Sequence, residues 1–236
     1  MRDLISAIDH TIDWPFYPSG NPADRYNDTG VSKTQSSQTQ FAAELIPQLF
    51  KAQDLRPDNL EDLDFATLSP FQRSLLVMVG LVTQFIEAYR LEPVKVLMLS
   101  QVPDQLSTGD AWLDAPAGAS VVHRRVLLRG EDSGEAYVYG EALLLPERLP
   151  ESVQLGLDRK DEGLGRLLIQ GKVESHGELL WCGVETLDEE LPESLGHLRG
   201  RPLISRTYRF VSVGQPLMRI TERFPLEDDS GKGDPS

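Results

Sequence analysis

Three charged side chains fall on strand faces that the sequence pattern predicts to be buried. In Val121–Pro146, two apolar runs flank turn residues 132–134, which is typical of a β-hairpin, and period-two alternation places Arg124 among valines and leucines. Near the C-terminus the same alternation places Arg206 beside aromatic residues and Glu222 beside aliphatic ones. Burying a charge is costly unless an opposite charge meets it, so each of these side chains requires a partner.

Two interpretations account for these charges, and the pattern does not separate them. In one, Arg124 or Arg206 forms a structural ion pair with Glu222. In the other, these buried charges mark a functional site, in which the local positive charge around Arg124 could hold a small anionic ligand.

Composition limits the classes of partner. The chain has 236 residues and a formal net charge of −14, so neither a nucleic acid nor an anionic membrane is expected as a partner. Locally, residues 123–129 hold three arginines and no acid, which suits a small anion. No apolar run approaches the roughly 18 residues of a membrane helix, and the N-terminus lacks the apolar run of a secretory signal. We therefore expect a cytoplasmic, monomeric protein that binds a small molecule.

The pattern along the chain predicts one folded domain with flexible ends. We expect a poorly ordered extension over residues 1–40 and a disordered acidic tail over 227–236. The domain itself is expected to span residues 41–226.

One long helix and several strands are expected within that domain. Ser69 and Pro70 are typical of a helix start, so a single helix is predicted over Ser69–Tyr89. A second, short helix is predicted to follow Leu164 and Gly165. The predicted strands and hairpins are Val94–Val102, Val121–Pro146, Leu179–Leu187 and Arg206–Pro225. Strands joined by short turns predict an α+β fold, in which helices flank a central, mostly antiparallel sheet.

Motifs for metals and for cofactors are absent. No phosphate-binding loop, dinucleotide fingerprint or serine-nucleophile elbow occurs. The 4 histidines are scattered without the spacing of a zinc site, and Cys182, the single cysteine, is expected as a small core residue. We expect neither metal nor cofactor, so arginines and carboxylates must supply the chemistry.

Several segments, taken in order, resemble the chorismate lyase (chorismate pyruvate-lyase) family. These segments are HRRVLL at 123–128, YGEALLLP at 139–146, Leu164-Gly165 and GQPLMRITERFP at 214–225. The resemblance covers residues from Ser69 to Pro225 and is greatest to the branch found in cyanobacteria and mycobacteria.

The resemblance implies a fold and a set of site residues. The family has a single α+β domain whose buried ligand cavity is closed by flaps. Arg124 matches the arginine that holds the carboxylate of the aromatic product, and Glu222 matches the glutamate at the hydroxyl end of the ring. Backbone groups of Leu164 and Gly165, and of Val82 in the early helix, would complete the pocket.

Two departures from the family pattern affect this assignment. The enterobacterial branch carries a further arginine on the second strand of the first hairpin, where this chain has Glu141 and Ala142. The last strand also has one more residue before Glu222 than that branch, which a β-bulge could absorb. If a second carboxylate must be bound, Arg206 is the candidate, with Arg209 as the next choice.

The function implied is that of a carbon–oxygen lyase that converts chorismate to 4-hydroxybenzoate and pyruvate, for quinone biosynthesis such as that of plastoquinone. Arg124 would bind the ring carboxylate, Arg206 the enolpyruvyl carboxylate, and Glu222 would transfer a proton. The alternative is a non-catalytic domain of the same fold that senses a small aromatic acid. A third interpretation is a structural protein in which the charges form only an ion pair.

Overall fold

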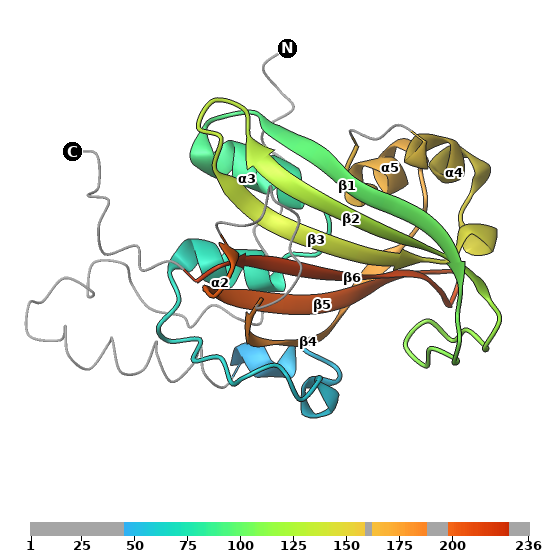
Figure 1. Cartoon of the computed structure of the whole chain (residues 1–236), viewed down its shortest axis with the longest axis horizontal. Helices are drawn as coiled ribbons and strands as arrows, with labels where there is room; N and C mark the ends of the chain where they lie inside the picture. The colour runs from blue at the N-terminus through green and yellow to red at the C-terminus, as the bar shows by residue number, and fades with distance from the viewer. Residues whose placement is uncertain (1–44, 159–161, 188–197, 227–236) are drawn as a thin grey trace, which may run out of the picture. The chain divides into compact units, whose positions relative to one another are not determined.

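The computed structural model describes residues 45–158, 162–187 and 198–226, all of which lie in one compact unit, Gln40–Ser236 (Figure 1). The predicted extension at 1–40 and the predicted tail at 227–236 lie outside the described residues, so the domain limits stay predictions. Within these ranges, no helix is long and apolar enough to cross a membrane.

A six-stranded antiparallel sheet forms the centre of the unit, which confirms the predicted α+β fold. The strands run in the order β1-β2-β3-β6-β5-β4, so the C-terminal hairpin joins the N-terminal meander through the β3–β6 pair. Their bounds are β1 Val94–Gln105, β2 Ser120–Gly130, β3 Ala136–Leu144, β4 His176–Thr186, β5 Pro202–Ser212 and β6 Gln215–Pro225. Both predicted hairpins are present, as β2–β3 and β5–β6.

Short helices lie on one face of this sheet, behind it in Figure 1. Their bounds are α2 Pro70–Val77, α3 Val82–Arg90, α4 Glu151–Leu157 and α5 Leu164–Gln170, with 3-10 turns η2 Gln53–Leu55 and η3 Pro146–Arg148. We call the sheet face that carries Arg124 and the helices the inner face, and the opposite face, which carries Arg125, the outer face. The main core fills the space between helices and inner face, and Leu76, Leu128 and Met218 belong to it.

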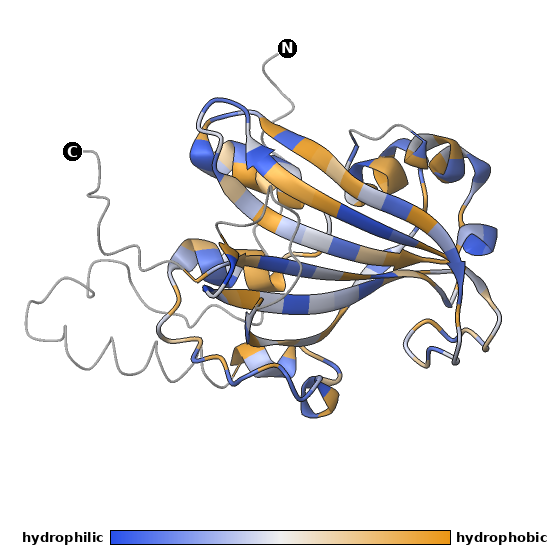
Figure 2. Ribbon diagram, in the orientation of Figure 1, coloured by the Kyte–Doolittle hydropathy of each residue, from blue (hydrophilic) through white to orange (hydrophobic). Residues whose placement is uncertain are grey.

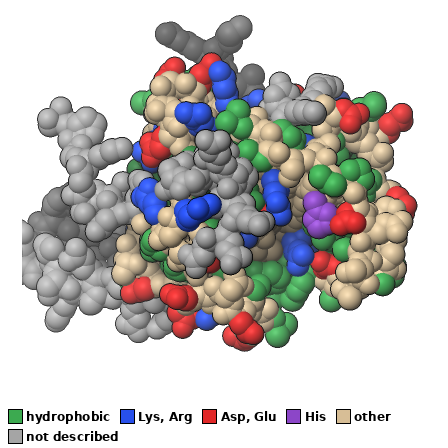
Figure 3. Space-filling view, viewed as in Figure 1, with side chains coloured by type: hydrophobic (Ala, Val, Ile, Leu, Met, Phe, Trp, Pro, Cys, Tyr) green, Lys and Arg blue, Asp and Glu red, His purple; other side chains and the backbone are tan. Residues whose placement is uncertain are grey.

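Hydrophilic and hydrophobic residues alternate along parts of the strands (Figure 2), and neighbouring side chains of a strand point to opposite faces of the sheet. On β2, Val126 and Leu128 share the inner face with Arg124, while His123 and Arg125 are exposed on the outer face. Figure 3 views the outer face and shows Lys and Arg side chains over the strands. Charged residues on strands are therefore common outside and exceptional inside.

The predicted long helix over Ser69–Tyr89 is wrong, because the structure has two helices there, α2 and α3. Its start is confirmed: Ser69 accepts a hydrogen bond from the backbone of Gln72, whose side chain accepts one from the Ser69 N–H. α2 ends at Val77 and α3 begins at Val82. Between them, the backbone at Gly80 and Leu81 has positive φ angles of +75° and +50°. Tertiary contacts described below hold this break, so the continuous apolar pattern could not reveal it.

Candidate functional site

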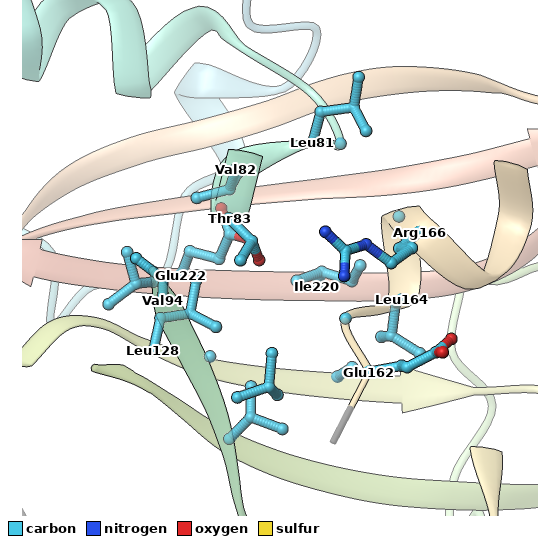
Figure 4. A pocket seen from close by; sticks show the side chains of 18 of the residues that line it. Leu81, Val82, Thr83, Val94, Leu128, Glu162, Leu164, Arg166, Ile220 and Glu222 are labelled. Atoms are coloured by element: carbon cyan, nitrogen blue, oxygen red, sulfur yellow. The ribbon is translucent and has the colours of Figure 1, made fainter. Parts of the chain in front are cut away.

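A cavity lies between the inner face of the sheet and the first turns of α3 and α5 (Figure 4). Much of its wall is apolar, with Val94, Val126, Leu128 and Ile220 among the residues that line it. Its volume of about 90 Å³ is several times the space that one water molecule needs, so a small molecule can enter. Apolar walls with a few polar groups are typical of ligand sites.

Arg124 lines this cavity with a guanidinium that is almost wholly buried. Only 2% of its surface is exposed, and burial lowers the pKa of Arg124 to about 10, so it stays charged at neutral pH. It donates to the side-chain oxygen of Gln101 at 2.6 Å and to the carbonyl oxygens of Glu162 at 2.7 Å and Leu157 at 3.5 Å. No carboxylate of the described residues forms an ion pair with it. Neutral carbonyl groups do not balance a full charge, so the site favours an anion.

Glu222 faces the same cavity from β6 and is held by two buried side chains of β5. Arg206 donates to its Oε2 through Nε at 3.0 Å and through Nη2 at 2.6 Å, and Tyr208 donates to its Oε1 at 3.0 Å. Burial, together with the charge of Glu222, raises the pKa of Tyr208 well above its ordinary value, so the hydroxyl keeps the proton that it donates. These hydrogen bonds fix a carboxylate at the cavity wall.

The structural ion pair is formed by Arg206 and Glu222, without Arg124. Arg206 is fully buried and is not among the residues that line the cavity. Its Nη1 donates to the carbonyl oxygens of Leu75 and Met78, at the end of α2. Because its nitrogens serve Glu222 and the helix end, the structure does not bring Arg206 to a place where it could bind a substrate carboxylate. Its position suits the orientation of Glu222 instead.

Arg209, the next candidate for the second carboxylate, does not line the cavity either. It lies on the outer face, where its guanidinium pairs with Glu178 at 2.7 Å and donates to the carbonyl oxygen of Trp112 at 2.7 Å. The second cationic anchor must therefore be sought elsewhere.

The bulge expected before Glu222 is present. Two consecutive residues of β5 pair with Pro216 and Met218 of β6, so Leu217 between them is an extra residue. Beyond this bulge Glu222 lies opposite Arg206 in regular register. The extra residue therefore leaves the carboxylate directed to the inner face.

Val82, Leu164 and Gly165 line the same cavity. Val82 begins α3 and Leu164 begins α5, and no side chain caps either helix. The first N–H groups of a helix have no acceptor within it, so those that face the cavity can donate to a ligand. Gly165 allows the two turns to meet, because a Cβ at this position would lie 3.0 Å from the backbone nitrogen of Leu81.

Several polar residues at or beside the site were not predicted. Tyr208 could have been found, since it shares a strand face with Arg206. Gln101, which bonds Arg124 from β1, and Thr83 and Arg166, which line the cavity from α3 and α5, carried no such signal. They come from elements distant in sequence, and only the fold brings them together.

The described residues offer no group of ≥ 3 His, Cys, Asp or Glu that could hold a metal ion. Cys182 is confirmed as a core residue: it is fully buried, and burial raises the pKa of its thiol to about 12, which keeps it from acting as a thiolate.

The structure is that of an α+β protein with a cavity lined by a buried arginine, Arg124, and a buried glutamate, Glu222. The chain belongs to the Rv2949c-like chorismate pyruvate-lyase family, whose family model matches residues 76–229. It is 27% identical over 175 residues to the chorismate pyruvate-lyase of Mycobacterium tuberculosis, a match that covers 70% of this chain and 84% of that protein. It is 24% identical over 158 residues to the chorismate pyruvate-lyase of Mycobacterium leprae, covering 64% of this chain and 72% of that protein.

Among solved structures, the chain is similar to PhnF from Mycobacterium smegmatis, with a TM-score of 0.47 and 12% identity over 64% of this chain and 65% of PhnF. The C-terminal domain of the histidine utilization repressor from Pseudomonas syringae gives a TM-score of 0.45 and 16% identity over 61% of this chain and 99% of that domain.

Proposed function

We propose that the chain is a chorismate pyruvate-lyase that releases 4-hydroxybenzoate and pyruvate from chorismate. The observation that carries the proposal is one cavity that holds both a buried arginine without a described counter-ion, Arg124, and a fixed carboxylate, Glu222. The family to which the chain belongs supports the same reaction, and so does its 27% sequence identity to the chorismate pyruvate-lyase of Mycobacterium tuberculosis.

The two groups suit opposite ends of the substrate ring. Arg124 binds the ring carboxylate, because a guanidinium pairs with a carboxylate through two parallel hydrogen bonds. Glu222 lies at the end of the ring that carries the hydroxyl group. Val126, Leu128 and Ile220 pack against the faces of the ring between them. This arrangement orients the substrate before any bond is broken.

The reaction breaks the carbon–oxygen bond to the enolpyruvyl group and removes the hydrogen from the neighbouring ring carbon. The ring becomes aromatic, and the enolpyruvate that leaves takes up a proton to become pyruvate. Glu222 accepts hydrogen bonds from Arg206 and from Tyr208. We therefore assign it the role of the general base that removes the ring hydrogen as a proton. Aromatisation supplies the driving force, and orientation with proton transfer is what the protein must add.

The place of the reaction in metabolism is a further part of the proposal. On the resemblance to the cyanobacterial branch, 4-hydroxybenzoate would enter quinone biosynthesis, as for plastoquinone. The cytoplasmic location and the monomeric state also stay predictions. Light scattering of the purified protein checks the second of these.

The decisive experiment is an assay of the purified protein with chorismate, without added metal or cofactor. We expect equimolar 4-hydroxybenzoate and pyruvate by chromatography, and loss of both with Arg124→Ala. Product no faster than the spontaneous background would contradict the lyase. Tight binding of 4-hydroxybenzoate in that case would indicate the alternative, a domain that senses a small aromatic acid.

A further inference from the structure

We propose that Arg166 binds the enolpyruvyl carboxylate of chorismate and thereby gives the site its preference for the dianionic substrate over the monoanionic product. The inference rests on the proposed function and extends it. It also supplies the second cationic anchor, for which the structure does not suit Arg206.

Arg166 occupies the mouth of the cavity. It lies in the first turn of α5, is exposed, and lines the same cavity as Arg124. Figure 4 shows its guanidinium directed from α5 towards the interior, on the side of Thr83 and Glu222. Among the described residues it has no ion-pair partner, so its charge is available to a ligand.

The charges around the cavity leave room for two negative groups. Arg206 and Glu222 neutralise each other, and the carboxylate of Glu141 pairs with Arg223 on the outer face at 2.6 Å. Figure 4 shows the carboxylate of Glu162 directed away from the interior. The positively charged side chains that line the cavity are those of Arg124 and Arg166.

The shape of the substrate matches this placement. In chorismate the ring carboxylate and the ring hydroxyl lie at opposite ends, while the enolpyruvyl ether is attached beside the hydroxyl. A ring held between Arg124 and Glu222 therefore sends its enolpyruvyl carboxylate sideways, out of the axis that joins them. Arg166 comes from the flank of the cavity, where such a group would emerge.

The product lacks this second carboxylate. Once the enolpyruvyl group has left, 4-hydroxybenzoate keeps only the contact with Arg124 and the contact with Glu222. Arg166 then favours a new chorismate molecule over the product, which helps a buried site to exchange one for the other. Because Arg166 is exposed, salt should weaken its contribution.

The test compares two ligands in two variants. For Arg166→Gln we expect the KM and the Kd for chorismate to rise about tenfold, with the Kd for 4-hydroxybenzoate within about twofold of wild type. Arg166→Lys keeps the charge and should restore part of the affinity for chorismate. Lys172→Asn is the matched control: it removes a cation just after the same helix, away from the cavity, and Asn tolerates the φ of +51° at this position.

Two results would overturn the inference. One is an unchanged affinity of Arg166→Gln for chorismate; the other is an equal loss for chorismate and for 4-hydroxybenzoate, which would mean that Arg166 only shapes the cavity. The Kd values are measured by calorimetry in proteins that also carry Glu222→Gln, because an active enzyme would convert chorismate during the titration. A wild-type protein that binds chorismate without converting it would contradict the lyase, and the calorimetric comparison would still test Arg166.

Discussion

Arg124 on the inner face and Arg223 on the outer face are both largely buried strand arginines, yet their surroundings are opposite. Arg223 pairs with Glu141 at 2.6 Å and with Glu185 at 2.7 Å. Burial alone would lower the pKa of Arg223, but the two carboxylates outweigh it and raise the pKa above its ordinary value. Burial lowers the pKa of Arg124 to about 10, and no described carboxylate offsets the effect.

Arg223 is a structural charge, whereas Arg124 is a candidate for ligand binding. Arg223 is satisfied by the fold itself, whereas the hydrogen bonds that Arg124 donates go to neutral oxygens. A buried charge that the fold leaves without a counter-ion is a candidate for a site that a ligand completes.

The largest effect is expected from Glu222→Gln. Loss of the proton acceptor should lower turnover about 10³-fold, while 4-hydroxybenzoate still binds. Glu185→Gln is the matched control, since it removes a buried carboxylate from an arginine pair on the outer face. Steady-state kinetics of both variants, with unfolding curves to verify that each is folded, decide the matter. Equal losses of turnover would contradict a special role for the inner-face pair.

Arg124→Met should lower the affinity for 4-hydroxybenzoate about 100-fold, because a charge-assisted pair with the ring carboxylate is lost. The stability of the unliganded protein should stay the same or rise, since an uncompensated buried charge is replaced by an apolar side chain. Calorimetric titration and thermal unfolding measure the two quantities. A marked loss of stability without loss of affinity would make Arg124 a structural residue.

Arg223→Met is expected to show the reverse. Removal of the guanidinium leaves Glu141 and Glu185 close together without their partner, which should lower the free energy of unfolding by about 2 kcal/mol. Turnover per folded molecule should be unchanged, because Arg223 does not line the cavity. Denaturant unfolding measures the change in stability, and the chorismate assay measures turnover. A variant as stable as wild type would show that the outer network is dispensable.

Acid should affect the outer face by a smaller amount. Hydrogen bonds from Lys51 and from Arg209 outweigh burial and lower the pKa of Glu178 from 4.5 to about 2. A carboxylate with a lowered pKa contributes stability above its unfolded-state pKa, and this contribution is lost as the pH falls from about 4.5 to about 2. Thermal unfolding over this window should show a Tm that declines by a few degrees. Glu178→Gln should decline less steeply; an identical slope would remove Glu178 as a cause.

Much of the fold could be predicted, because strand alternation is a local property of the sequence. It places Arg124 and Glu222 on the inner face correctly and predicts both hairpins. It could not predict the break before Leu81, since this depends on the carbonyl oxygens that Arg206 binds and on the approach of Gly165.

The site itself was predictable only in part, for the same reason. Arg206 shares the inner face with Glu222, as the alternation predicts. The sequence does not show that its guanidinium donates hydrogen bonds to the carbonyl oxygens at the end of α2. Arg166 lies in a helix of 7 residues, too short for a periodic signal, and only its place beside the cavity marks it. The spacing of residues along a strand predicts which face of the sheet carries a side chain. Only the folded structure shows whether that side chain reaches a cavity.

The double engagement of Arg206 links the chemistry of this protein to its folding. The guanidinium that orients Glu222 also binds the last carbonyl oxygens of α2. A chain in which this helix has not yet ended correctly therefore has no correctly held carboxylate. For the proposed lyase, a molecule in which this helix end has not formed is therefore expected to show no turnover of chorismate.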